Sequence, residues 1–192
     1  MAEDLVNSNF KIVVIGGSAG SLEVLLNILP QLEFTNFPIV IVLHRMVGED
    51  SALEELIGAR AILPVQIVED KTGLWPGYVY VAPSDYHLLF EKNRTLSLDL
   101  SPKVTHSRPS IDVTFESAAD AYGKNVVGIL LSGANHDGTR GLELIRDNGG
   151  QIIVQDPLTA QMPFMPNFAI EKLNPELVYD VDEIVRFLQT FQ

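Results

Sequence analysis

Three polar segments of the chain, each of which follows a hydrophobic run, carry the residue types that could do chemistry. They contain Ser18, His44 and Asp137, respectively. A hydroxyl, an imidazole and a carboxylate together can form a serine nucleophile that a histidine activates and a carboxylate orients. Their order along the chain is no objection, because such a triad is defined by its geometry. The three segments therefore predict acyl transfer through a serine.

The glycine-rich turn around Ser18 also admits two other interpretations. Residues 16–21 read Gly-Gly-Ser-Ala-Gly-Ser and precede a helical pattern, so their backbone amides could cradle a phosphate at a helix N-terminus. The dinucleotide fingerprint needs glycine at the first, third and sixth places, whereas Ser18 and Ser21 occupy the last two of these. The fingerprint therefore fails, and nucleotide binding stays the weaker hypothesis. In the other interpretation Ser18 merely caps the following helix.

His44 and Asp137 have structural alternatives as well. A histidine at the carboxyl end of a strand is well placed to act as a general base, but single histidines are often structural. Asp137 could orient an imidazole or could cap the helix that follows it. The adjacent His136 competes as a base. Because the side chains of neighbouring residues usually point apart, we expect only one of the pair 136–137 to face the site.

The segments that must position these residues alternate between strand and helix patterns. Short, continuously apolar runs such as 38–43 and 126–131 are typical of strands that are covered on both faces. Stretches with helical spacing separate them, which indicates parallel strands joined by crossover helices. The predicted strands are 11–15, 38–43, 64–69, 78–82, 126–131, 151–155 and 177–178, and the predicted helices are 21–32, 50–58, 110–122, 139–147, 167–173 and 181–191.

A hairpin interrupts this alternation. Residues 87–91 and 95–98 flank the polar stretch 92–94, which predicts two antiparallel strands. We therefore predict an α/β fold with a doubly wound, mostly parallel sheet, flanking helices and an inserted antiparallel hairpin. In such sheets the working site lies beyond the carboxyl ends of the strands, where the three polar segments fall.

Length and composition narrow the class of protein. The 192 residues are 46% hydrophobic, contain no cysteine and carry a formal net charge of −12. We expect residues 1–192 to form one domain with a buried core. The missing cysteine excludes a thiol nucleophile and thiolate metal sites, and the acidic charge disfavours nucleic acid as a partner. Without a signal-peptide pattern or a run of roughly 18 apolar residues, we expect a cytoplasmic protein with no membrane insertion.

Several short motifs, in order and at matching spacing over about residues 11–190, resemble the catalytic domain of CheB-type protein-glutamate methylesterases. They cover nearly the whole chain, which makes the resemblance more specific than a single glycine loop would be. The motifs are Val14-Ile-Gly-Gly-Ser-Ala-Gly20, Leu43-His44, Pro76-Gly-Tyr-Val-Tyr-Val-Ala-Pro83 with His87-Leu88, Arg108-Pro-Ser-Ile-Asp112, Leu131-Ser-Gly133, Asp137-Gly138, Gly141-Leu142, Gln155-Asp156, Met165-Pro166 and Ala169-Ile170.

The resemblance implies a role for several residues. Ser18 would be the nucleophile, His44 the base and Asp137 the third member of the triad. It further implies an oxyanion site near the backbone N–H groups of Ala19 and Ala134, and Met165 belongs to a segment that could form a substrate-binding wall of the pocket. It implies neither a metal ion nor an organic cofactor.

The implied reaction is hydrolysis of glutamate methyl esters on the cytoplasmic helices of methyl-accepting chemoreceptors, or on another methylated signalling protein, with release of methanol. Some family members also deamidate receptor glutamines. A non-catalytic signalling adaptor on the same fold is the alternative. Chemotaxis members carry an N-terminal phosphorylatable receiver domain, but we expect none here because only about ten residues precede the first predicted strand.

The chain departs from the family pattern near the expected site. His44 is followed by Arg45-Met46-Val47 where Met-Pro is frequent, Ser21 takes the place of a glycine, and Ala134 takes that of a methionine. His136 is unusual beside the aspartate. No departure removes a member of the predicted triad. Because they line the mouth of the site, they bear on the identity of the substrate.

Overall fold

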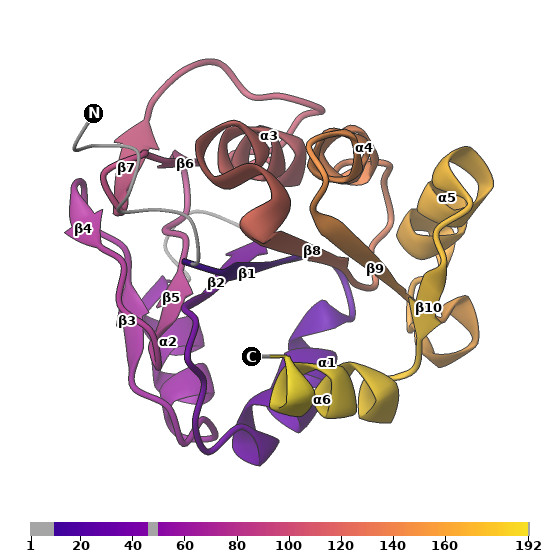
Figure 1. Cartoon of the computed structure of the whole chain (residues 1–192), viewed down its shortest axis with the longest axis horizontal. Helices are drawn as coiled ribbons and strands as arrows, with labels where there is room; N and C mark the ends of the chain where they lie inside the picture. The colour runs from indigo at the N-terminus through magenta and orange to yellow at the C-terminus, as the bar shows by residue number, and fades with distance from the viewer. Residues whose placement is uncertain (1–9, 46–49, 192) are drawn as a thin grey trace.

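The computed structural model describes residues 10–45 and 50–191, with the backbone alone for residues 50 and 51. A seven-stranded parallel sheet forms its centre, and a three-stranded antiparallel sheet lies beside it (Figure 1). The strands of the large sheet are β1 (Ile12–Gly17), β2 (Ile39–Leu43), β3 (Val65–Ile67), β5 (Val79–Val81), β8 (Val126–Leu130), β9 (Gln151–Gln155) and β10 (Leu177–Tyr179).

The strand order β10-β9-β8-β1-β2-β5-β3 places the first strand of the chain in the middle of the sheet. From β1 the chain builds outward on one side through β2, and it later returns to β8 on the other side. The order therefore reverses between β1 and β8, which is where ligands bind in sheets of this kind. The three segments singled out above follow β1, β2 and β8, so they meet at this place.

Helices cover both faces of the sheet (Figure 1). One face packs against α3, α4 and α5, and the other packs against α1, α2 and α6. The helices are α1 (Ser21–Ile28), α2 (Asp50–Gly58), α3 (Ile111–Tyr122), α4 (Thr139–Asp147), α5 (Phe164–Leu173) and α6 (Val181–Thr190), and short 3-10 turns are Leu29–Gln31, Gly123–Asn125 and Pro157–Thr159.

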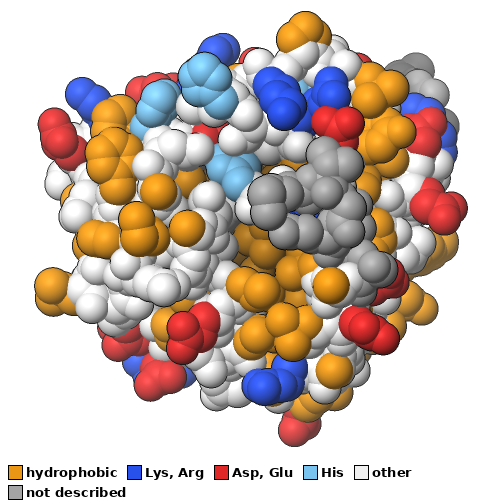
Figure 2. All heavy atoms as spheres, turned by 180° about the vertical axis from the view of Figure 1, so that it is seen from behind, with side chains coloured by type: hydrophobic (Ala, Val, Ile, Leu, Met, Phe, Trp, Pro, Cys, Tyr) orange, Lys and Arg blue, Asp and Glu red, His pale blue; other side chains and the backbone are white. Residues whose placement is uncertain are grey.

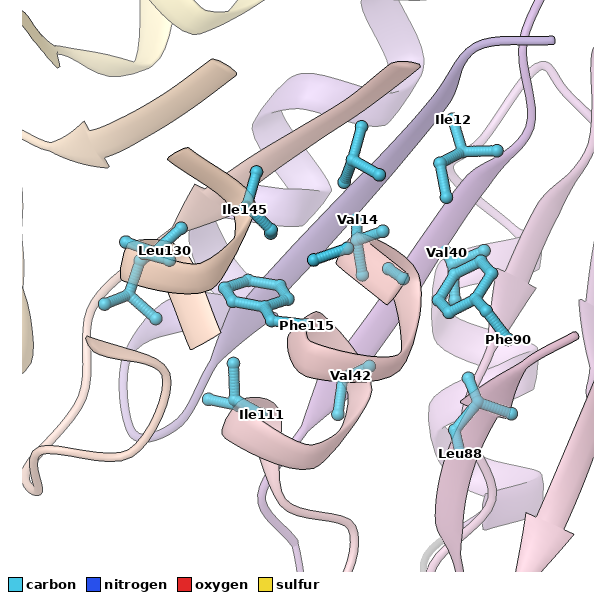
Figure 3. Close-up of a cluster of buried hydrophobic side chains, with 14 of the residues drawn as sticks. Ile12, Val14, Val40, Val42, Leu88, Phe90, Ile111, Phe115, Leu130 and Ile145 are labelled. Carbon is cyan, nitrogen blue, oxygen red and sulfur yellow. The ribbon is translucent and has the colours of Figure 1, made fainter. Parts of the chain in front are cut away.

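Successive side chains of the central strands point to opposite faces of the sheet and pack into two separate hydrophobic cores. Ile12 and Val14 of β1 belong to the cluster under α3, whereas Val13 and Ile15 belong to the cluster under α1. Figure 3 shows Val14 lying between β2 side chains and Phe115 of α3. All five side chains are fully buried, and each contributes roughly 1.5–3 kcal/mol relative to exposure. Burial on both faces explains why these strands are continuously apolar in sequence.

The small sheet confirms the predicted hairpin and adds one strand to it. Strands β6 (His87–Phe90) and β7 (Thr95–Asp99) pair antiparallel, and β4 (Thr72–Gly73) pairs with the other side of β7. The sequence did not predict β4, because a two-residue strand is too short to show any alternation. The predicted α/β class, with a mostly parallel sheet and an inserted hairpin, is confirmed.

Two predicted helices differ from those in the structure by more than one residue at one end. The helix predicted over 21–32 ends at Ile28 and continues as a 3-10 turn that contains Pro30. The start predicted for the fifth helix, Asn167, was wrong, because α5 begins at Phe164 and contains Pro166 in its first turn. Proline is tolerated there because the first N–H groups of a helix have no intrahelical partner. Across residues 10–45 and 50–191, the helices include none with the length and apolar character that crossing a bilayer requires.

Candidate active site

Backbone hydrogen bonds continue the parallel pairing past the strand ends and hold the three segments side by side. The Ser18 N–H donates to the carbonyl oxygen of Ser132 at 2.9 Å. The His44 N–H donates to the carbonyl oxygen of Gly17 at 3.1 Å. The main chain therefore fixes where Ser18 and His44 leave the sheet, relative to each other and to the segment that ends in Asp137.

The turn that carries Ser18 is tight. A side chain at Gly17 would come within 2.5 Å of the Ser21 Cβ, so only glycine fits there. Gly20 has a φ of 83° and is the N-cap of α1, which has no side-chain cap bond. The Ser21 hydroxyl and N–H both donate to the carbonyl oxygen of Ser18. The interpretation of Ser18 as a side-chain cap of α1 was therefore wrong.

His44 and Asp137 form a direct pair. The Nε2 atom of His44 lies 2.7 Å from Oδ2 of Asp137, whose side chain is fully buried, and the His44 side chain is 10% exposed. An ionised carboxylate accepts only, so Nε2 carries the proton and Nδ1 is left as the basic nitrogen. The Asn135 amide nitrogen lies 3.4 Å from Nδ1. Asp137 therefore fixes the tautomer in which Nδ1 can take a proton.

Asp137 is held by the N-terminus of α3 as well as by His44. Its carboxylate accepts from the N–H groups of Ile111 at 2.7 Å and Asp112 at 3.0 Å, and from the Ser110 hydroxyl at 3.0 Å. Burial by itself raises the pKa of this carboxyl, but the bonds from His44 and from the amides of Asp112 and Ile111 outweigh it. The pKa consequently lies below its ordinary value, and the group is a fixed anion. Asp137 is not the side-chain cap of α4, whose N-cap is Gly138.

Ser18 and His44 line the same cavity of about 420 Å³. Its other walls include the apolar side chains of Leu22, Leu53 and Leu56, from α1 and α2. Figure 2 shows a face of the molecule on which hydrophobic side chains gather beside histidine side chains. Within the residues that the structure describes, no hydrogen bond joins the Ser18 hydroxyl to His44. Such bonds often form only when substrate is bound.

A metal site would need a cluster of ligand side chains in the described part of the chain. Among the residues described there, no cluster of three or more histidine, aspartate or glutamate side chains could hold a metal ion. The arrangement at the sheet edge is instead a hydroxyl, an imidazole and a buried carboxylate around an apolar cavity. That arrangement is suited to activating the hydroxyl towards a carbonyl carbon.

Comparison with known proteins identifies the family. The model of the CheB methylesterase family matches residues 13–188. The chain belongs to this family. A relative from Leptospira interrogans, named for protein-glutamate methylesterase and protein-glutamine glutaminase, is 42% identical over 92% of this chain and 92% of its own length. A Thermotoga maritima protein named for the same two activities is 37% identical over 84% of this chain and 48% of its own length.

A solved structure agrees with the fold. The crystal structure of the Thermotoga maritima CheB methylesterase catalytic domain superposes with a TM-score of 0.89 at 34% identity, covering 94% of this chain and 97% of that one. Proteins named protein-glutamate methylesterase are carboxylic ester hydrolases, and this chain is such a hydrolase by family. The catalytic interpretation is therefore supported over that of a non-catalytic adaptor.

The remaining predicted site residues of this CheB family member, Ala19, Ala134 and Met165, differ in their exposure to solvent. Ala134 is exposed and Ala19 lines the cavity, with its carbonyl oxygen accepting from the Ser132 hydroxyl at 2.8 Å. Met165 is fully buried in α5, and its side chain packs so closely on Gly133 that no Cβ would fit there. The structure thus places Met165 under the loop instead of on an open wall. The oxyanion site at Ala19 and Ala134 stays a prediction.

The two members of the pair 136–137 do point apart. His136 is exposed, and its ring lies 5.5 Å from that of Phe168 on α5, whereas Asp137 is buried against His44. Of the chain's departures from the family pattern, Met46 and Val47 lie outside the described residues, and the Arg45 guanidinium donates to the carbonyl oxygen of Ala82.

Sequence reasoning missed Asp112 and Asn135 as members of the site. The cap of α3 is Ser110, whose hydroxyl accepts from the Val113 N–H, so Asp112 is not needed as a cap of its own helix. Asp112 instead reaches α4. The motif Arg108-Pro-Ser-Ile-Asp112 was a usable signal, since an aspartate two residues into a helix has no need to cap it. For Asn135 the sequence holds no such signal.

Proposed function

We propose that this protein removes methyl esters from glutamate side chains by way of a covalent acyl-serine. Ser18 is the nucleophile, His44 the base and Asp137 the carboxylate that orients the imidazole. The single observation that carries the proposal is the His44–Asp137 pair, 2.7 Å apart, in the wall of the cavity that Ser18 also lines. The names of the relatives support the choice of ester.

In the first half of the reaction, the Ser18 Oγ attacks the ester carbonyl carbon as its proton passes to Nδ1 of His44. The negative charge that develops on the carbonyl oxygen would be met by backbone N–H groups at Ala19 and Ala134, at the start of α1 and in the loop after β8. Donors of this kind typically contribute roughly 3–4 kcal/mol to such steps. Asp137 stabilises the imidazolium that forms.

In the second half, the C–O bond to the methoxy group breaks, and that oxygen takes the proton from His44 to leave as methanol. Water then attacks the acyl carbon while His44 accepts one of its protons. The bond to Ser18 Oγ breaks, and the proton returns to that oxygen. The products are a glutamate carboxylate and the free serine. A glutamine side chain would follow the same steps, with ammonia leaving in place of methanol.

The partners we propose are the methylated cytoplasmic helices of chemoreceptors, or another methylated signalling protein, met in the cytoplasm by residues 1–192 acting as one catalytic domain. The apolar walls contributed by Leu22, Leu53 and Leu56 suit an uncharged methyl ester better than the carboxylate product. The formal net charge of −12 would further repel that product.

Methanol release from a methylated receptor fragment tests the proposal. Wild-type protein should release methanol, and the Ser18→Ala variant should be slower by at least about a thousandfold, because the nucleophile is gone. Ser101→Ala, at an exposed serine outside the cavity, is the matched control and should retain full activity. Equal release by wild type and Ser18→Ala would refute the assignment.

A further inference from the structure

Asp112 is a partly buried carboxylate that the proposed reaction leaves without a role. It lies in the first turn of α3, yet its Oδ1 accepts from the N–H groups of Gly138 at 2.9 Å and Gly141 at 2.8 Å. These amides begin α4, which has no cap bond from a side chain of its own. Asp112 is therefore the cap of a neighbouring helix, supplied from α3.

Asp137 makes the corresponding contact in the opposite direction, from the side of α4 to the N-terminus of α3. It lies in the loop that leads into α4, and it accepts from the N–H groups of Ile111 and Asp112 at the start of α3. The first N–H groups of each helix thus donate to a carboxylate that the other helix, or the loop before it, provides. Loss of the bonds between Asp112 and α4 would shift the loop that carries Asp137, and loss of the bonds between Asp137 and α3 would shift Asp112. The positions of Asp112 and the triad residue Asp137 therefore depend on each other.

Two glycines allow the helix ends to approach this closely. A Cβ at Gly141 would lie 2.4 Å from the Phe115 Cβ and 3.0 Å from the Asp112 carbonyl oxygen. Gly138 adopts a φ of 96°, a conformation that side chains other than glycine's rarely accept, and a Cβ there would meet Leu130 and Ile111. The first turn of α4 therefore lies directly against Asp112 and Phe115 of α3.

The charges around Asp112 leave it facing another anion. Asp137 is one neighbour, and Asp112 also lines a small cavity together with His136, Arg140 and Glu143 from the region of α4 and Lys172 from α5. Arg140 pairs with Glu116 of α3 at 3.8 Å. Among the described residues, no side chain forms an ion pair with Asp112. The amides of α4 are thus its principal counter-charge.

Burial first, and the charge of Asp137 after it, raise the pKa of Asp112 to about 6, although the amides of Gly141 and Gly138 act in the other direction. At neutral pH two adjacent carboxylates are then both ionised, one of them in contact with His44. Two negative charges stabilise an imidazolium better than one, because the cost of forming a cation near them is lower.

We propose that Asp112 is a positioning residue of this hydrolase: ionised, it fixes the loop that presents Asp137 to His44 and places a second negative charge behind that pair. The inference rests on the proposed roles of Ser18, His44 and Asp137, and it deepens them. Protonation of Asp112 removes the second charge and gives one of its oxygens a proton to donate towards Asp137. The activation of Ser18 therefore falls as Asp112 takes up its proton.

The rate at which a fluorophosphonate probe labels Ser18, measured from pH 5 to 9, tests this without a receptor substrate. The Asp112→Asn variant keeps an acceptor oxygen for the amides of α4 but cannot ionise. We expect about tenfold slower labelling at pH 8 than in wild type, and an acidic limb that is less steep than that of wild type because Asp112 no longer titrates. Asp112→Ala, which also loses the cap, should be slower still, and its circular dichroism and melting temperature report whether it folds.

Asp120→Asn, at an exposed aspartate of the same helix, is the matched control and should follow the wild-type profile. Asp112→Asn with the wild-type rate and the wild-type limb would overturn the inference and leave Asp112 a purely structural cap. A uniform loss with an unchanged limb would do the same. A wild type that labels no faster than Ser18→Ala would overturn it too. Rapid labelling without methanol release from a methylated receptor would count against the proposed function alone.

Discussion

The two halves of the candidate site, one around Asp137 and one around Ser18, are built by opposite means. The Asp137 carboxylate accepts four hydrogen-bond contacts, from His44, Ser110, Ile111 and Asp112, and is fully buried. Ser18 is placed by its main chain alone and lines an open apolar cavity. Within the described residues its hydroxyl has no hydrogen bond.

This difference matches what each half has to do. The charge that stabilises an imidazolium must not reorganise during the reaction, so it benefits from a rigid surrounding of amides and a helix N-terminus. The nucleophile has to turn from the base to the ester and back, so its side chain needs room. Changes on the Asp137 side should therefore affect folding and activity together, and changes on the Ser18 side should affect activity alone.

The largest expected effect is that of Asp137→Asn. An amide at this position donates where Nε2–H of His44 donates, so the imidazole loses its tautomer, and kcat should fall on the order of 10³–10⁴-fold. The N-terminus of α3 loses an anion as well, so the melting temperature should also fall. Ser18→Ala, compared in the same assays, should lose activity at an unchanged melting temperature. Equal thermal losses in the two variants would erase the distinction between the halves.

The next largest effect concerns stability and pH at Asp112. Its folded-state pKa of about 6 lies above the ordinary value of 3.8, so the unfolded chain releases this proton first. Stability contributed by this group therefore falls as the pH rises from about 4 to 6. A pKa shift of this size corresponds to about 3 kcal/mol. Relative to wild type, the free energy of unfolding of Asp112→Asn should therefore rise by up to this amount between pH 4 and pH 7.

Urea unfolding at several pH values measures that difference. Asp120→Asn should show no such trend, because its carboxylate is exposed. If the difference in the free energy of unfolding between Asp112→Asn and wild type stays constant with pH, ionisation of Asp112 does not destabilise the folded protein. A variant that gains stability at pH 7 while it loses activity would mark Asp112 as a group kept for the reaction at a cost in folding.

The central fold and the residue types of the site were open to prediction because they depend on local pattern. Fully buried strands such as β2 are continuous apolar runs, and the loops after them are the polar stretches of the chain. The start of α5 at Phe164 was missed because closely spaced prolines such as Pro163 and Pro166 are typical of loops. Asp112 and Met165 could not be placed, since one acts on a helix 26 residues away and the other packs under Gly133. Such contacts arise only when the elements pack together.

A smaller effect is expected in the cavity beside Ser18. Leu56 is 40% exposed on α2 and forms part of the apolar wall. Leu56→Asp should raise KM for a methylated receptor fragment by about tenfold with little change in kcat, because a charge there disfavours the uncharged ester before any bond is broken. Leu158→Asp, at a leucine that is 94% exposed and outside this cavity, is the control. An unchanged KM in Leu56→Asp would mean that the substrate does not occupy this wall.

The smallest effect is expected for His136, which competes with His44 as a base in the sequence alone. Its ring is exposed against Phe168, and its neighbour Asp137 turns the other way, towards His44. His136→Ala should therefore keep kcat/KM for methanol release within about twofold and stability within about 0.5 kcal/mol, the range of ordinary surface changes. His44→Ala is the comparison and should lose about a thousandfold or more. If His136→Ala instead matched that loss, the base would lie on the exposed side of the loop, and the rigid Asp137 half would serve the fold and not the reaction.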